Sequence, residues 1–168
     1  MATNRELAQG YLEQARVDLA GAAAMGASSP STLAMLIQMV FEKYAKAVFL
    51  RQNPGEEMRA WAGKTHASAS RLLLILRRQK RILAPLGGSK VWEDVLWVIP
   101  ELERAHPQLA PREGPMLEYP WEDLHGQVRW PARDLKIAAS LGDPRKTLGA
   151  RVLLFLEKLG RDFDRIFA

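Results

Sequence analysis

The chain has 168 residues, of which 48% are hydrophobic and 26% are charged, with a formal net charge of +5 and no cysteine. A chain of this length buries roughly 70% of the surface that its unfolded form exposes, so it needs no cross-link to hold a core. Without cysteine, a disulfide framework, a thiolate zinc site and a cysteine nucleophile are excluded. We expect one domain over residues 1–168 and a cytoplasmic location.

The sequence also predicts that the protein has no membrane partner. No hydrophobic segment of the kind found in secretory signals follows the first residues. The longest apolar run, Leu72–Leu76, is far shorter than the ~20 residues that a membrane-spanning helix needs.

The first predicted helix lies close to the N-terminus. From Leu7 to Ala23, apolar residues recur at spacings of three and four, which places them on one helix face. Thr3 and Glu6 have the spacing of a capping box at its start. Residues 26–30 contain glycine, serine and proline and are expected to end it.

The second predicted helix is long and amphipathic. It begins at Pro30, which suits the first helical position because an N–H there would have no helical partner. It carries Glu42, Lys43 and Lys46 beside a stripe of apolar residues. Residues 53–55, with the sequence Asn-Pro-Gly, end it, since proline cannot donate a hydrogen bond and clashes with the preceding turn.

Two further helices are expected in the middle of the chain. A short helical turn covers residues 56–61, and a third helix runs over about residues 65–81. After the break at the glycines of residues 87–88, Ser89 caps a fourth helix, which Pro100 is expected to kink or divide.

The last third of the chain differs in character. Residues 107–133 contain five prolines, which excludes a continuous helix and predicts a long proline-rich loop. The last helix is expected to start at Asp143-Pro144 and to run to the C-terminus along one apolar stripe. No segment alternates between polar and apolar residues well enough to indicate a strand. The predicted fold is all-α: an antiparallel up-and-down bundle of four to five helices with a long proline-rich loop before the last helix.

The positive charge is concentrated in one block. Residues 71–90 hold six basic side chains and no acidic one, whereas residues 91–125 hold eight acidic and two basic side chains. The basic block either forms a phosphate-binding surface or lies on one of two consecutive helices. In the second case, its charges pair with the acidic side chains of the next helix or are solvated by water. The overall excess of basic over acidic residues is smaller than in most proteins whose main partner is nucleic acid.

His66 is the histidine with the clearest candidate role. It lies at the predicted N-terminus of a helix, where unpaired N–H groups and the helix dipole favour anions. Arg71 follows about one and a half turns later, and Lys43 and Lys46 share a face of the preceding long helix. We name Lys43, Lys46, His66 and Arg71 as candidate nucleotide- or phosphate-binding residues. The alternative is that the two lysines belong to a solvated polar stripe.

Two Glu-x-x-His pairs, Glu103–His106 and Glu122–His125, have the spacing used in di-metal helical bundles. Their histidines are only 19 residues apart, too few for two long facing helices and a turn. The second pair also falls in the proline-rich loop. We therefore predict no metal site and no cofactor.

Taken together, these segments resemble the HEPN family of small prokaryotic helical domains. The resemblance rests on the helix of residues 33–49, with Glu-Lys-Tyr-Ala-Lys-Ala at residues 42–47, and on His66 after it. It includes Asp18 in the first helix, the Tyr-Pro pair at residues 119–120 and the closing amphipathic helix. The match covers most of the chain in order.

The resemblance implies a homodimer, a nucleotidyltransferase partner and a role in a toxin–antitoxin module. Many such domains are metal-independent RNases that use an Arg and a His separated by four to six residues. Arg59 and His66 meet this spacing, but Ala60 follows the arginine where family RNases place a polar residue. We therefore expect a non-catalytic domain that binds a nucleotide, an RNA end or a nucleotidyltransferase partner. The alternatives are a metal-independent RNase that uses Arg59 and His66, and a structural dimerisation module.

Overall fold

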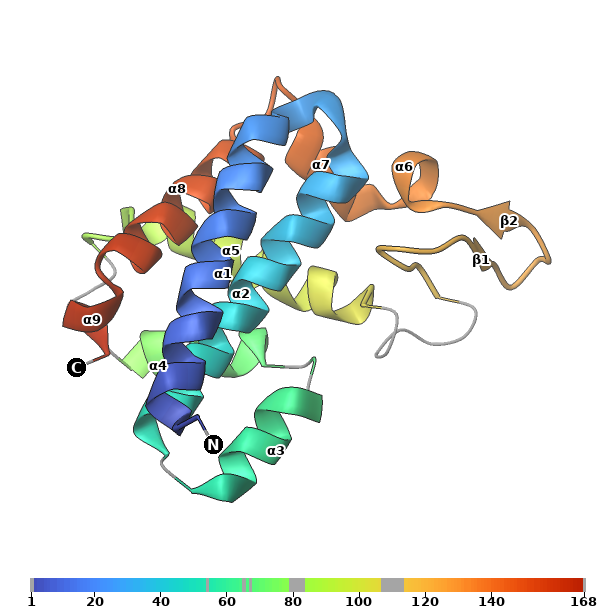
Figure 1. The fold of residues 1–168 in the computed structure, drawn as a ribbon. Coiled ribbons are helices and arrows are strands. Elements are labelled where there is room, and N and C mark those ends of the chain that lie inside the picture. Colours follow the sequence, from blue (N-terminus) through green and yellow to red (C-terminus); the bar gives the residue numbers. More distant parts are fainter. Residues whose placement is uncertain are drawn as a thin grey trace.

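Two long helices, α1 (Asn4–Met25) and α2 (Pro30–Gln52), form an antiparallel hairpin against which most of the other helices pack (Figure 1). Of the residues that the structure describes, 75% are helical. The predicted all-α class is confirmed for this part of the chain, apart from one small two-stranded sheet. The computed structural model describes residues 2–53, 55–64, 66, 68–78, 84–106 and 114–167.

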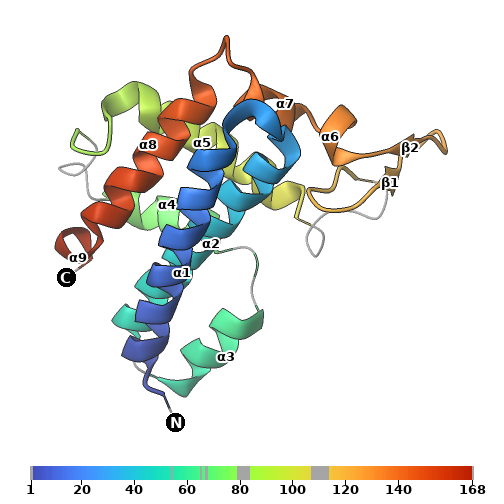
Figure 2. The same ribbon diagram turned by 45° about the horizontal axis from the view of Figure 1, so that its top comes forward.

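After the hairpin, the chain continues with shorter helices and one pair of strands. α5 crosses behind the hairpin in Figure 1, while α8 packs against α1 (Figures 1 and 2). The elements are α3 (Glu56–Lys64), α4 (Ala69–Arg78), α5 (Gly88–Arg104), β1 (Trp121–Glu122), β2 (Val128–Arg129), α6 (Pro131–Asp134), α7 (Lys136–Gly142), α8 (Leu148–Arg161) and α9 (Phe163–Ile166).

Both ends of α1 follow from the local sequence. The Thr3 hydroxyl accepts a hydrogen bond from the Glu6 backbone N–H, and the Glu6 carboxylate accepts one from the Thr3 backbone N–H at 2.6 Å. The predicted capping box is therefore present. At the other end, Gly26 adopts a φ of 51°, a conformation that glycine takes without strain. A 3-10 turn (Gly26–Ser28) leads into α2, whose first residue is Pro30 as predicted.

α2 is the central helix of the fold. It contacts α1, α4, α5, α7 and α8, and its side chains Phe41, Tyr44 and Val48 are completely buried. The Phe41 ring lies 6.1 Å from the ring of Phe155 in α8, and the Tyr44 ring lies 5.8 Å from that of Phe163 in α9. Because α2 is covered on several sides, each charged group on it needs a partner within the protein.

The middle helices differ from the prediction in detail. Of the two outcomes predicted for Pro100, division of the helix is wrong, because α5 is one helix that includes this residue, while a kink stays a prediction. Proline removes a single backbone hydrogen bond, and the buried face of α5, with Val95, Ile99 and Leu102, holds the helix together. α4 begins at Ala69, later than predicted, and residues 79–83, where the predicted helix ends, lie outside the described residues.

The proline-rich segment contains short elements that the sequence pattern did not predict. β1 and β2 pair antiparallel, with Trp121 opposite Arg129, and α6 and α7 follow. The Asp123 carboxylate shapes the hairpin turn by accepting hydrogen bonds from the backbone N–H groups of His125 and Gln127 at 2.9 and 3.0 Å. The prediction of a loop without strands is therefore wrong for residues 121–129. This hairpin projects from the helical body in Figures 1 and 2.

The last long helix is present, but it begins later than predicted and does not run to the C-terminus, because α8 ends at Arg161 and the short α9 follows. Asp143 lies in a turn, where its side chain accepts a hydrogen bond from the Arg145 backbone N–H at 3.0 Å, and α8 starts only at Leu148. Such a side-chain bond competes with the start of a helix. No helix in the described part of the chain has the length and apolar character that crossing a membrane requires.

Candidate functional site

Four polar side chains meet in the interior next to α2, and we call them the Glu42 cluster: Glu42, Lys46, His66 and His106. Glu42 and Lys46 come from α2, His66 lies between α3 and α4, and His106 follows α5. Glu42 is 9% exposed, Lys46 5% and His106 8%. Buried ionisable groups are rare unless they are paired, so this concentration marks the first candidate for a functional site.

The Glu42 carboxylate is the centre of the cluster. Its Oε1 accepts a hydrogen bond from Lys46 Nζ at 2.7 Å and lies 3.4 Å from His66 Nδ1. Its Oε2 accepts a hydrogen bond from Gln38 Nε2 at 3.1 Å. Because these residues are four positions apart on α2, the helix itself brings Gln38 and Lys46 to either side of Glu42. The carboxylate is therefore held in one orientation by both of its oxygens.

The two histidines of the cluster are stacked. Their ring centroids are 4.5 Å apart, and the ring planes differ by 21°. Burial lowers the pKa of His106, and the nearby His66 lowers it further, against the opposing effects of Glu42 and Glu118. The imidazole of His106 is thereby biased toward its neutral form.

Contacts between α2, α4 and α5 position the histidines. The Ser68 hydroxyl donates a hydrogen bond to the Glu42 carbonyl oxygen at 3.4 Å. The Ser70 backbone N–H donates to Glu103 Oε1 at 3.0 Å, and the Ser70 hydroxyl donates to the other carboxylate oxygen. Glu103 thus places an anion at the N-terminus of α4, where it is favoured. These bonds connect the segment that carries His66 to the end of α5 that carries His106.

Three members of the cluster carry the donor atoms that metals prefer. The side-chain donor atoms of Glu42, His66 and His106 all lie within 4.8 Å of one another. This cluster was not predicted from the sequence, because only Glu-x-x-His pairs close in sequence suggest metal ligands there. His66 and His106 are 40 residues apart, and no spacing in the sequence connects them.

The candidate phosphate-binding lysines are both held by carboxylates. Lys43 Nζ donates a hydrogen bond to Asp18 Oδ2 in α1 at 2.6 Å, and Lys46 donates to Glu42. The Lys46 ammonium also lies 5.6 Å from the centroid of the Tyr11 ring. The structure brings Lys46 and His66 together on one carboxylate and places Lys43 on a different one.

Arg59 and His66 contact different partners. Arg59 Nε donates to Asn4 Oδ1 at 3.3 Å, and its guanidinium also donates to the Ala2 carbonyl oxygen. Asn4 in turn donates to the Asn53 carbonyl oxygen at the end of α2. Asn53 lies eleven residues after Glu42, or ~16 Å along the helix axis. The structure therefore directs Arg59 to the end of α2 and His66 to Glu42.

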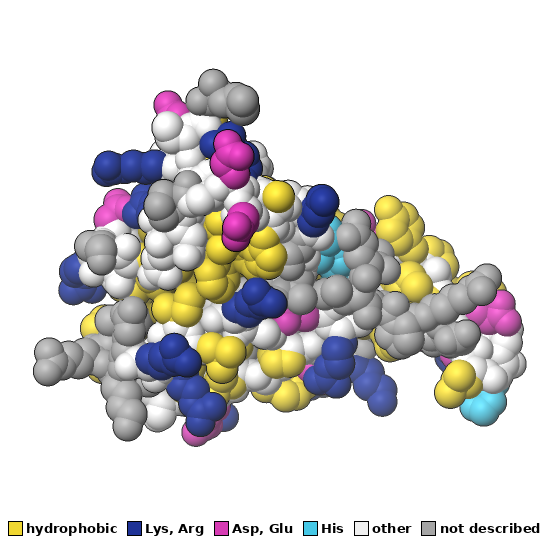
Figure 3. Space-filling model, turned by 90° about the horizontal axis from the view of Figure 1, so that it is seen from below, with side chains coloured by type: hydrophobic (Ala, Val, Ile, Leu, Met, Phe, Trp, Pro, Cys, Tyr) yellow, Lys and Arg dark blue, Asp and Glu magenta, His cyan; other side chains and the backbone are white. Residues whose placement is uncertain are grey.

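Arg71, the fourth candidate, lies on the exposed face of α4. Its guanidinium carbon is 5.6 Å from the centroid of the Trp61 ring. Leu74 and Arg78 follow it at helical spacing and are also exposed. Neither arginine forms an ion pair with another described residue. Figure 3 shows a face of the molecule on which basic and acidic side chains border a hydrophobic area, with a histidine on the same face.

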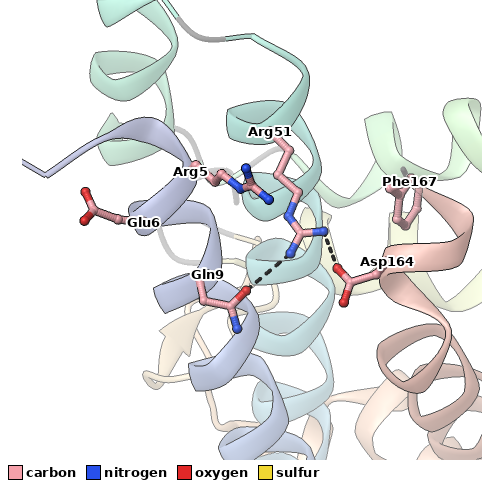
Figure 4. A pocket seen from close by; sticks show the side chains of 6 residues that line it. All are labelled: Arg5, Glu6, Gln9, Arg51, Asp164 and Phe167. Atoms are coloured by element: carbon pink, nitrogen blue, oxygen red, sulfur yellow. Dashed lines mark hydrogen bonds and ion pairs between the residues drawn. The ribbon is translucent and has the colours of Figure 1, made fainter.

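A separate open pocket of about 730 Å³ lies where α1, the end of α2 and α9 meet (Figure 4). Arg51 occupies it, donating to Gln9 Oε1 at 3.3 Å and to the Asp164 carboxylate. Arg5 also lines the pocket. Arg51 lowers the pKa of Asp164, and the ion pair between the two side chains neutralises the charge of the arginine within this pocket. No member of the Glu42 cluster lines this pocket.

Comparison with family models, curated proteins and solved structures identifies no match to this chain. The site therefore has to be interpreted from its own geometry and chemistry.

Proposed function

We propose that the protein is a HEPN-like helical bundle that binds the phosphate group of a nucleotide or of an RNA end without cleaving it. The observation that carries this proposal is the exposed face of α4, on which Arg71 and Arg78 have no acidic partner among the described residues. Arginine presents several N–H donors in a planar fork that fits phosphate oxygens.

The proposal assigns different roles to the four candidate residues. Arg71 contacts phosphate, together with Arg78, which lies about two turns further along the same face of α4. His66 lies in the segment that precedes α4 and is partly exposed. Lys43 and Lys46 have only a secondary role, because carboxylates at 2.6 and 2.7 Å already neutralise them. Their contribution to binding is therefore smaller than that of the two arginines.

The contacts of Arg59 support binding without cleavage. An arginine that stabilises a reacting phosphate must lie close to the general base. Arg59 instead donates to Asn4 and Ala2, while His66 faces Glu42. Incubation of the protein with total RNA in chelator tests the RNase alternative. Cleavage that His66→Ala or Arg59→Ala abolishes would replace this proposal with that enzyme.

A salt-dependent titration tests phosphate binding. Labelled single-stranded RNA and ATP are titrated against the wild type and against Arg71→Gln/Arg78→Gln at several salt concentrations. Loss of two phosphate contacts should make the slope of log K against log salt shallower by ~1.4 for single-stranded RNA. The matched control is Lys136→Gln/Lys158→Gln, which removes the same charge from α7 and α8. Equal slopes for all three proteins would refute the proposal.

A protein partner belongs to the same proposal, either a second copy of the chain or a nucleotidyltransferase. Its support is the β1–β2 hairpin, which projects from the body and exposes apolar side chains. Leu124 is 85% exposed and Val128 61%, and such residues often mark interaction surfaces. Sedimentation of the wild type and of Leu124→Ser/Val128→Ser at several concentrations measures the homodimer. A wild type that stays monomeric throughout would leave the nucleotidyltransferase as the partner to test.

A further inference from the structure

Three elements that are distant in sequence bring metal-ligating atoms to one place. Glu42 comes from the middle of α2, His66 from the segment before α4 and His106 from the end of α5. Their donor atoms lie within 4.8 Å of one another, and two of the three residues are less than 10% exposed. A chance cluster of surface acids would be exposed and rich in carboxylates, whereas this one is mostly buried and contains two imidazoles.

We propose that Glu42, His66 and His106 bind a divalent transition-metal ion of the zinc type. Two imidazole nitrogens and one carboxylate oxygen are a ligand set that Zn²⁺ takes in proteins, with the fourth position open to water or to another ligand. This inference shares His66 and Lys46 with the proposed phosphate site but requires neither Arg71 nor Arg78, so metal binding and phosphate binding are tested by different variants.

The ligands have to move only slightly to close around an ion. Zinc bonds of about 2.0–2.1 Å place neighbouring tetrahedral ligands ~3.3 Å apart. The donor atoms therefore need to approach one another by no more than ~1.5 Å. Rotation of the two imidazoles out of their stacked arrangement supplies such a movement, since terminal torsions of histidine are broad.

Lys46 identifies the place that the ion would take. A buried carboxylate requires a compensating cation, and the Lys46 ammonium fulfils this role at 2.7 Å from Glu42 Oε1. That oxygen is also the one nearest His66. A bound ion would compete with the ammonium for Glu42, and Gln38 would continue to orient the other carboxylate oxygen. Removal of Lys46 should therefore strengthen metal binding, which is the opposite of its effect on a phosphate site.

The test measures Zn²⁺ binding to the full chain after treatment with chelator. A competing chromophoric chelator reports the affinity and the number of ions bound. We expect one ion per chain, at least a tenfold loss of affinity in His106→Gln and in His66→Gln, and a gain in Lys46→Met. Lys136→Met is the matched control, because it removes the same charge from an exposed position of α7. Its affinity should equal that of the wild type.

A second measurement on the wild type keeps the test decisive if a variant fails to fold. The chain has three histidines, and the third, His125, is exposed on the hairpin. In imidazole NMR spectra, Zn²⁺ should shift the ring signals of His66 and His106 and leave those of His125 unchanged. Absence of Zn²⁺ binding, binding that survives His106→Gln, or ring shifts confined to His125 would each overturn the inference.

Discussion

Tyr44 of α2 and Gly160 of α8 lie in close contact, and this contact offers a quantitative test of how the two helices are placed. Tyr44 is completely buried, and its hydroxyl has no hydrogen-bond partner among the described residues. Gly160 faces it so closely that an added Cβ would lie 2.1 Å from the hydroxyl oxygen and 3.0 Å from the ring carbon Cζ. We therefore predict that Gly160→Ala and Tyr44→Phe are strongly coupled.

The expected free energies of unfolding follow from this geometry. Tyr44→Phe removes a buried hydroxyl that forms no hydrogen bond, and should stabilise the protein by ~1 kcal/mol. Gly160→Ala forces an atom into occupied space and should destabilise it by ~2 kcal/mol. With phenylalanine at position 44, the atom at 2.1 Å is gone, so the alanine should cost ~1 kcal/mol less than in the wild type.

Urea and thermal unfolding of the four proteins measure this coupling. For a chain of this size, ~1 kcal/mol corresponds to a shift in Tm of roughly 2–4 °C. Gly10→Ala is the control, because Gly10 is an exposed residue of α1 with no neighbouring atom within 4 Å. It should stabilise the protein by ~1 kcal/mol through helix propensity alone. Additive effects of the two substitutions at the interface would refute the predicted packing of α2 against α8.

Three further predictions concern charged and titrating groups. Lys43→Met should lower the free energy of unfolding by ~3 kcal/mol, since it leaves the mostly buried Asp18 carboxylate without its cation. Urea unfolding measures this change, and a loss of less than ~1 kcal/mol would contradict a buried ion pair. The backbone N–H of Gln127 and the neighbouring Arg129 lower the pKa of Asp123. The charged carboxylate therefore stabilises the hairpin fully at any pH above the ordinary pKa of an aspartate. This stability is lost as the pH falls through the lowered pKa. Carboxyl NMR should show Asp123 titrating below pH 3.8, and an ordinary value would contradict the turn geometry. Burial raises the pKa of Tyr44 to about 12, so folding favours the neutral phenol, and the free energy of unfolding should decline as the pH rises from 10 toward 12; ultraviolet titration should detect one tyrosine that ionises near pH 12.

Local interactions explain why the first helices could be predicted well. The capping box of Thr3 and Glu6, the proline at the start of α2 and the apolar spacing of both helices act between residues that are close in sequence. The same argument did not predict that α5 continues through Pro100. There, burial against neighbouring helices outweighs the one hydrogen bond that proline removes.

The hairpin of residues 121–129 could not be predicted from the pattern of polar and apolar residues. Strands of two residues are too short to show alternation, so prolines were the stronger signal in this segment. The turn depends on Asp123 accepting hydrogen bonds from the backbone, an interaction that sequence spacing alone does not distinguish from a surface carboxylate. The resemblance to the HEPN family and the proposed phosphate binding remain predictions.

For the candidate site, the sequence by itself determined that Glu42 and Lys46 share a helix face, because four residues make about one turn. Only the tertiary structure decided that His106 joins His66 beside them and that Arg59 does not. The physical reason is that helical spacing sets distances within one element only. Distances between elements depend on how their apolar faces pack, and this packing brings the end of α5 to the middle of α2.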